Sequence, residues 1–304
     1  MLFKYNKLKK VYFIRNNLRK IVINISDLLG IVFPKIFLIK QIHRQSRLTI
    51  YNLHSTQENY FSHYKSVLKE INSQEKFLNP KNIDNFFKKK YSNQSFSLLT
   101  LDDGFFNNLE FAKKVLKPLK IKAIFFIIPS LLKDKKNKNK EFFEILYPNY
   151  KERVIYNLEK QFTPLSKEDI IKIQKLGHTI GMHGFNHERF SELSEKKINK
   201  LIKEGINIFK KLNIKIIHFA YPFGDKNSFS VRSNRVLKKY FKYIHLGIRG
   251  SNYSLKLSNS SKLLKRHPIS THKKDLIYFP ISLKELKFFT QNRISLLFNL
   301  VSRK

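Results

Sequence analysis

The middle of the chain alternates between short apolar runs and longer segments with helical periodicity. Four mainly apolar runs are each long enough for one strand: Phe96–Leu101, Ile121–Ile128, Thr179–Met182 and Ile214–Phe219. Continuous apolar runs of this kind are typical of strands that are buried on both faces of a sheet. We therefore expect a sheet that is covered by helices.

The segments between these runs predict amphipathic helices. Asn107 and Asn108 are candidate N-cap residues for the first helix, because apolar residues follow them at helical spacing. Ser166, with Asp169 three positions later, forms a capping-box pattern for the second helix, and Ser194 starts the third. This alternation predicts an α/β fold in which crossover helices join parallel strands, in either a barrel or a doubly wound sheet.

Polar residues follow the predicted strands directly. Asp102 and Asp103 end the first strand, His183 and His187 follow the third, and Tyr221–Gly224 follows the fourth. In parallel α/β folds, the carboxyl ends of the strands form the face that carries the active site. Three separate segments are therefore expected to meet on one rim.

The composition restricts the chemistry of this rim. The chain has 304 residues and no cysteine, which excludes disulfides, thiolate metal ligands and a cysteine nucleophile. Histidine and carboxylate side chains are then the remaining strong metal ligands. Two imidazoles and one carboxylate leave coordination positions open for water, which suits hydrolysis at zinc, iron or cobalt.

The chain is strongly basic. Lysine and arginine outnumber acidic residues 60 to 22, for a formal net charge of +38, which favours nucleic acid or an anionic membrane as a partner. The basic residues are spread along the whole chain, and no zinc finger, aromatic RNA-binding motif or basic zipper accompanies them. We expect no specific nucleic-acid partner and keep a non-catalytic membrane or nucleic-acid binder as an alternative.

Two extensions are predicted around a central domain at residues 47–275. Residues 1–46 form a basic N-terminal extension with one acid, Asp27, and an apolar stretch, Leu28–Ile39, that is too short to span a bilayer. No secretory signal pattern is recognised, so we expect a cytoplasmic protein. The extension either packs on the domain or holds the protein against the anionic inner face of the membrane. Residues 276–304 are expected to form a C-terminal helical extension.

The residues of the predicted rim resemble the motifs of one enzyme family. Leu99–Gly104 resembles the Thr-Phe-Asp-Asp-Gly motif of the polysaccharide deacetylases, carbohydrate esterase family four. Gly177–His187 is similar to their second motif, in which a glycine-rich strand leads into His-Ser/Thr-x-x-His. Phe219–Gly224 resembles the third, Pro-Tyr/Phe-Gly, and Leu48–His54 resembles the first strand of the longer members. The resemblance covers about residues 47–275.

This resemblance implies a distorted (β/α) barrel that hydrolyses an N-acetyl or similar amide of an amino sugar, in a polysaccharide or a glycan precursor. It implies a divalent metal held by Asp103, His183 and His187, with zinc first and cobalt, nickel or iron as alternatives. Asp102 is implied as the general base that takes a proton from water. A backbone N–H near Phe223 is implied as a donor to the oxyanion.

The family pattern implies further contacts. Tyr221, Pro222 and Phe223 are implied to line the substrate and oxyanion site. The leaving amine needs a proton, and His267 is the candidate acid because it lies one residue from the spacing of a Leu-x-His motif of the family. The same segment resembles an Arg-x-Pro-Ile ending, in which Arg266 is the retained residue.

Three positions differ from the family pattern. Gly184 stands where Ser or Thr is usual, Glu188 replaces a common Pro, and Ala220 stands where many members have Arg. The candidate ligand atoms are not changed by these differences. A metal-dependent amidohydrolase that acts on a non-sugar amide could use the same fold and ligands, and this alternative stays open.

Overall fold

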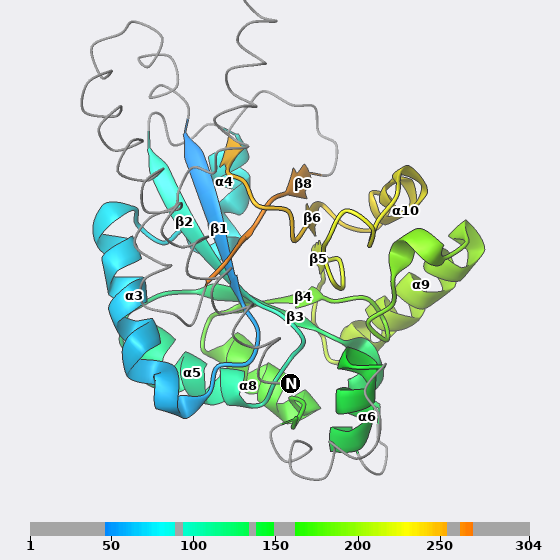
Figure 1. Ribbon diagram of the computed structural model, residues 1–304, viewed down its shortest axis with the longest axis horizontal. Helices are drawn as coiled ribbons and strands as arrows, with labels where there is room; N and C mark the ends of the chain where they lie inside the picture. The colour runs from blue at the N-terminus through cyan, green and yellow to red at the C-terminus, as the bar shows by residue number, and fades with distance from the viewer. Residues whose placement is uncertain (1–45, 89–93, 134–137, 149–161, 254–261, 270–304) are drawn as a thin grey trace, which may run out of the picture. The chain divides into compact units, whose positions relative to one another are not determined.

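The computed structural model describes most of the predicted central domain (Figure 1). The described residues are 46–88, 94–133, 138–148, 162–253 and 262–269. They belong to the second of two compact units, residues 1–45 and 46–304, into which the chain divides. The basic N-terminal extension, with its expected membrane contact, and the C-terminal extension at 276–304 lie outside the described residues, so both stay predictions.

The strands form one curled sheet whose neighbours are mostly parallel. They are β1 (Arg47–Leu53), β2 (Ser95–Leu101), β3 (Ala123–Ile127), β4 (Thr179–Met182), β5 (His218–Ala220), β6 (Tyr243–His245), β7 (Asn252–Tyr253), β8 (Lys262–Leu264) and β9 (His267–Pro268). Their order in the sheet is β7-β1-β2-β3-β4-β5-β6-β8, and β9 pairs with β1. Within the described part of the chain, β7 is antiparallel to β1 and the other strand pairs are parallel.

One short segment connects the two edges of this sheet. Only Lys265 and Arg266 separate β8 from β9 along the chain. β8 pairs with β6 at one edge, whereas β9 pairs with β1 at the other, with Tyr51 opposite His267. The sheet therefore closes into an irregular barrel, which confirms the expected distorted (β/α) barrel and excludes the doubly wound alternative.

Most helices lie on the outside of the curled sheet (Figure 1). The described α-helices are α3 (Phe61–Gln74), α4 (Ile83–Phe87), α5 (Asn107–Phe111), α6 (Lys138–Leu146), α8 (Lys167–Lys175), α9 (Glu195–Lys211) and α10 (Val231–Leu237). Shorter turns are the 3-10 helices η1 (Glu58–Tyr60), η2 (Pro80–Asn82), η4 (Pro129–Leu132) and η7 (Phe190–Glu192), and the π-helical η3 (Ala112–Leu116). None of the described helices combines the length and apolarity that crossing a membrane requires.

Two of the three predicted helix starts are confirmed. The Ser166 hydroxyl accepts the N–H of Asp169, and the Asp169 carboxylate accepts the N–H of Ser166, at the start of α8. The Ser194 hydroxyl accepts the N–H of Lys197 at the start of α9. These side chains satisfy backbone donors that have no partner within the helix.

The cap predicted at Asn107 or Asn108 is wrong, because α5 begins at Asn107 itself. The Asn107 amide donates to the Ser55 hydroxyl at 2.8 Å and accepts the Thr56 N–H at 3.0 Å. Asn108 Oδ1 accepts the Thr56 hydroxyl at 2.8 Å. Both side chains thus hold the loop after β1, and this loop begins at His54.

Alternate residues of each strand face two different cores. In β2, Leu99 packs with the outer helices, whereas Leu98 belongs to the cluster inside the barrel. In β3, Phe125 faces the outer helices and Phe126 faces the interior. Since both faces are buried, the strands read as continuous apolar runs in the sequence.

Candidate active site

Asp102 and Asp103 lie where β2 ends and the chain turns towards α5. Asp103 has a left-handed backbone (φ 72°), as has Gly104 (φ 83°), and the Gly104 N–H donates to the Asp102 carbonyl at 3.0 Å. This tight turn lets the two adjacent carboxylates leave the chain in different directions. Both are buried, at 2% and 6% exposure, so each needs a partner for its charge.

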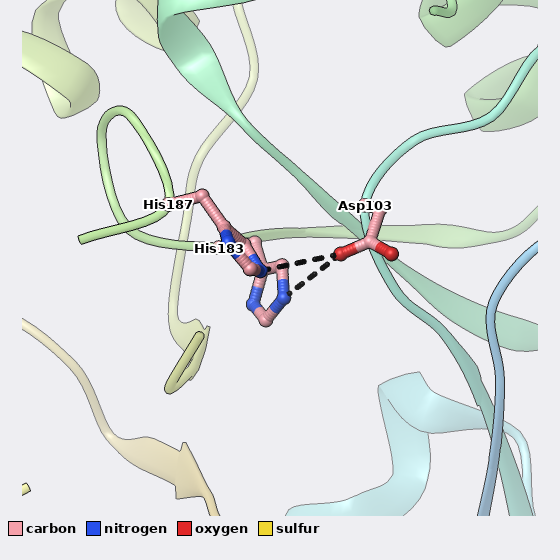
Figure 2. A group of neighbouring side chains, drawn as sticks. All are labelled: Asp103, His183 and His187. Carbon is pink, nitrogen blue, oxygen red and sulfur yellow. Dashed lines mark ion pairs between the residues drawn. The ribbon is translucent and has the colours of Figure 1, made fainter. Parts of the chain in front are cut away.

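Two imidazoles from the loop after β4 approach Asp103 (Figure 2). Asp103 Oδ1 lies 3.2 Å from His183 Nε2 and 3.7 Å from His187 Nε2. One ligand atom from each of the three residues lies within 4.8 Å of the others. His183 Nδ1 lies 2.9 Å from the Ala220 carbonyl, which can only accept, so Nδ1 donates and Nε2 is directed at the group.

The charge states of these residues fit a divalent cation. Burial opposes ionisation of Asp103, but the neighbouring imidazoles outweigh it and hold the pKa of this carboxyl well below its usual value. Burial, together with the neighbouring His183, lowers the pKa of His187 to about 4, so His187 is a neutral imidazole. His187 Nδ1 is buried and has no hydrogen-bond partner among the described residues.

His183 would complete this ligand set in its neutral form. Although burial lowers the pKa of His183, the two aspartates raise it above its usual value. A cation that binds between Asp103 and His183 would displace that proton, because a histidine ligand must be neutral. The group therefore has the donor set of a metal site with three protein ligands and open positions.

Asp102 is held by a buried arginine. Arg266 Nη1 donates to Asp102 Oδ1 at 2.7 Å and to Thr100 Oγ1 at 3.2 Å, and its Nε donates to the Leu246 carbonyl at 3.1 Å. Burial raises the pKa of Asp102, but the Arg266 charge and nearby histidines outweigh it and lower the pKa overall. Asp102 is therefore ionised at neutral pH. Arg266 reaches it from the segment between β8 and β9.

His267 is not brought to these residues. Arg266 and Pro268 line the pocket over Asp102, whereas His267 between them does not. Adjacent side chains of an extended segment point in opposite directions, and the His267 ring lies 6.3 Å from the Tyr51 ring, measured between centroids. The position of His267 therefore gives no support to its expected role as the acid.

His54 is the histidine that faces Asp102 instead. It lines the pocket, its Nε2 lies 4.0 Å from Asp102 Oδ2, and its side chain is 55% exposed. The rule that located the other candidates, a polar residue directly after a strand, also applies to His54, because β1 ends at Leu53. No second histidine lies close to His54 in the sequence to form a candidate pair like His183 and His187. The sequence pattern alone therefore does not indicate a role for His54.

The loop Tyr221–Gly224 reaches the pocket mainly with its backbone and one ring. The Tyr221 ring is fully buried, its hydroxyl donates to Asn234 Oδ1 at 2.9 Å, and its N–H donates to the His245 carbonyl at 3.0 Å. Phe223 has a left-handed backbone (φ 62°), and its exposed ring lies 4.6 Å from the His187 ring between centroids. Tyr221 thus supports the loop, and Phe223 presents its backbone and ring.

All of these groups open onto one pocket of about 320 Å³. Its lining includes Asp102, the Asp-His-His group, His54 and Arg266, and also Leu146 and Tyr147 from the end of α6 and beyond. α6 packs through its own small cluster, in which the Phe105 and Phe142 rings lie 4.8 Å apart between centroids. The pocket is therefore formed jointly by the strand ends and by the segment between β3 and β4.

Comparison with known proteins shows which family has this combination of fold and sequence motifs. The family model described as polysaccharide deacetylase matches residues 89–240. A search of curated proteins finds no significant match to the chain.

Several solved structures share the fold at low sequence identity. The structure of IcaB from Ammonifex degensii has a TM-score of 0.58 and 17% identity, over 74% of this chain and 92% of that one. The Streptococcus pyogenes deacetylase PplD in complex with acetate has a TM-score of 0.55 and 15% identity, over 78% and 99%. The de-N-acetylase from Aggregatibacter actinomycetemcomitans has a TM-score of 0.53 and 12% identity, over 81% and 99%.

The solved structures support the barrel fold, and the match to the family model supports the class of enzyme. The matched residues 89–240 include Asp102, Asp103, His183 and His187. The chain therefore belongs to the polysaccharide deacetylase family, whose enzymes remove acyl groups by cleaving carbon–nitrogen bonds other than peptide bonds.

Proposed function

We propose that this protein is a metal-dependent deacetylase that removes N-acetyl groups from an amino sugar of a polysaccharide or glycan precursor. The observation that carries the proposal is the buried Asp103-His183-His187 group, whose ligand atoms lie within 4.8 Å of one another beside an ionised Asp102. Zinc is the first candidate, because two imidazoles and one carboxylate with open positions are a common catalytic zinc set.

Asp103, His183 and His187 would hold the metal. When bound there, a divalent cation polarises the carbonyl of the acetamide and makes a water molecule easier to deprotonate. The Ala220 carbonyl, 2.9 Å from His183 Nδ1, keeps one imidazole in the tautomer that the site needs.

Asp102 is the proposed general base. Its Oδ1 is occupied by Arg266 at 2.7 Å, which leaves Oδ2 to take the proton from the attacking water. The lowered pKa of Asp102 keeps it ionised and ready to accept. Arg266 also compensates the buried negative charge before attack, so little reorganisation is needed during the reaction.

Phe223 and His54 are proposed to serve the oxyanion and the leaving amine. The Tyr221 and Gly224 N–H groups are engaged by the His245 and Pro222 carbonyls, which leaves the Phe223 N–H of this loop to donate to the oxyanion. His54 lines the same pocket within 4.0 Å of Asp102 Oδ2. An imidazole at this position is placed to give a proton to the departing amine.

The direct test is acetate release by the zinc-loaded protein from N-acetylglucosamine oligomers, compared with N-acetylated amides that contain no sugar. We expect release from the sugar substrates and a loss of about 10²–10⁴-fold in Asp102→Asn, with zinc retained. Release only from the sugar-free amides would support a non-sugar amidohydrolase instead. Undiminished turnover by Asp102→Asn would remove Asp102 from the mechanism.

A further inference from the structure

Two of the three departures from the family pattern lie directly after the proposed ligands His183 and His187. Gly184 follows the first histidine, and Glu188 follows the second. His187 itself has a left-handed backbone (φ 56°), a conformation that non-glycine residues adopt only at a cost and that the surrounding structure has to maintain. Contacts from surrounding residues must therefore stabilise this conformation of the loop.

The Glu188 side chain folds back over the loop and binds two of its backbone amides. Glu188 Oε2 accepts the Phe185 N–H at 2.9 Å, and Oε1 accepts the Asn186 N–H at 2.9 Å. One carboxylate thus satisfies two consecutive donors between the two histidines. Hydrogen bonds of this kind to an ionised acceptor are stronger than those between neutral groups.

Gly184 leaves the space that this carboxylate needs. The backbone at position 184 is left-handed (φ 66°), and a Cβ atom there would lie 3.0 Å from Glu188 Oε2 and 2.9 Å from Pro222 Cγ. A serine or threonine at position 184 would therefore press on both neighbours. The two departures are therefore complementary. Gly184 leaves space for the Glu188 carboxylate, and this carboxylate accepts the hydrogen bonds of the loop.

The other side of the loop is held by Ser130. The Ser130 N–H donates to the Phe185 carbonyl at 3.0 Å, and its hydroxyl donates to Asn186 Oδ1 at 2.8 Å. Ser130 therefore engages acceptors of the loop, whereas Glu188 engages its donors. Loss of Glu188 should loosen the loop without unfolding it.

We infer that Glu188 is a positioning residue for the metal site: its carboxylate sets the backbone between His183 and His187 before a metal binds. This rests on the proposed function only in that the two histidines are taken as ligands. Partners that orient metal ligands from outside commonly change metal affinity by about 10–100-fold when removed.

The test compares Glu188→Ala and Glu188→Gln with Glu192→Gln as a matched control. Glu192 is a 72% exposed glutamate of the same region, and it pairs with Arg189 at 3.7 Å. Zinc affinity is measured by competition with a chromophoric chelator. Hydrogen–deuterium exchange of residues 183–190 is measured on the metal-free proteins.

We expect zinc binding to weaken about 10–100-fold in Glu188→Ala, less in Glu188→Gln, and not in the control. Glutamine is intermediate because its amide offers one acceptor in place of two. The loop should exchange faster in both Glu188 variants even without metal. Unchanged zinc affinity in Glu188→Ala, or unchanged exchange in the metal-free loop, would overturn the inference.

A wild-type protein that binds no zinc would contradict the proposed function instead. In that case the exchange measurement still decides whether Glu188 sets the loop. The two failures are therefore distinguishable.

Discussion

Arg266 Nη1 donates to Asp102 Oδ1 at 2.7 Å, and both side chains are almost fully buried. Removal of one partner of a buried ion pair leaves an uncompensated charge, which typically costs about 3–5 kcal/mol of stability. Arg266→Met should therefore destabilise the protein strongly. The free energy of unfolding, from chemical denaturation, measures this effect.

The matched control for this pair is the double variant. Asp102→Asn removes the charge that Arg266→Met leaves unpaired, so the combination should be more stable than Arg266→Met alone. Strictly additive losses in the two single variants and the double variant would show that the two side chains are not energetically coupled.

His54 and His267 offer a direct comparison of the two candidate acids. His54 lines the pocket and His267 does not. We expect His54→Gln to lower kcat by about 10²–10⁴-fold, while His267→Gln keeps most of the activity. Steady-state acetate release by the two variants decides between them. The opposite order of effects would restore His267 as the acid.

Protein stability should fall in mild acid because several histidines are buried in neutral form. Burial, with a contribution from Lys122, lowers the pKa of His178 to about 4. Its Nδ1 accepts the Ala123 N–H at 3.1 Å, an interaction that needs the neutral ring. Unfolding returns His178 to its usual pKa of 6.5, so the unfolded chain binds a proton that the folded chain excludes.

The stabilisation from His178 is therefore complete above pH 6.5 and is lost as the pH falls towards 4. Between pH 7 and pH 5 this amounts to about 2 kcal/mol, since one pKa unit is worth about 1.4 kcal/mol. His178→Asn keeps an acceptor but cannot titrate, so its free energy of unfolding should depend less on pH. An equal pH dependence in wild type and variant would contradict this account of His178.

Tyr147 is expected to contact the sugar. Its ring lines the pocket and is 43% exposed, which suits stacking against a pyranose ring. Tyr147→Ala should raise KM for the oligosaccharide about tenfold with little change in kcat, because tenfold corresponds to about 1.4 kcal/mol of binding. Tyr60→Ala, at a tyrosine with 41% exposure outside the pocket lining, is the control.

Tyr147→Phe should behave like wild type, because the ring face is kept. Hydrolysis of a small aryl acetate without a sugar should be the same in all of these proteins. A KM for the oligosaccharide that is unchanged in Tyr147→Ala would remove Tyr147 from the substrate site.

The residues that meet at the pocket could be predicted from sequence where local rules apply. Asp102, Asp103 and His183 directly follow apolar strands, and His187 lies in the same loop as His183. Parallel strands place their carboxyl ends on one rim. The same alternation of strands and helices predicted parallel strands joined by crossover helices, and the family resemblance favoured the barrel over the doubly wound sheet. For these features, the local pattern and the tertiary structure agree.

The remaining features depend on contacts that no local pattern contains. Arg266 and Asp102 are 164 positions apart, and they meet only because the β8–β9 segment crosses from one edge of the sheet to the other. Asn107 and Asn108 look like helix caps locally, but the β1 loop offers their side chains better partners. Hydrogen bonds to this distant loop therefore determine the side-chain positions of Asn107 and Asn108, rather than their place before a helical sequence pattern.

The proposed function depends most on Asp103, His183 and His187 holding a metal ion. Elemental analysis of the purified protein, exposed to zinc and then freed of excess metal, tests this most directly. We expect about one zinc per chain in wild type and almost none in His183→Ala, because the loss of one of three protein ligands strongly weakens such a site. Equal metal content in the two proteins would contradict the claim.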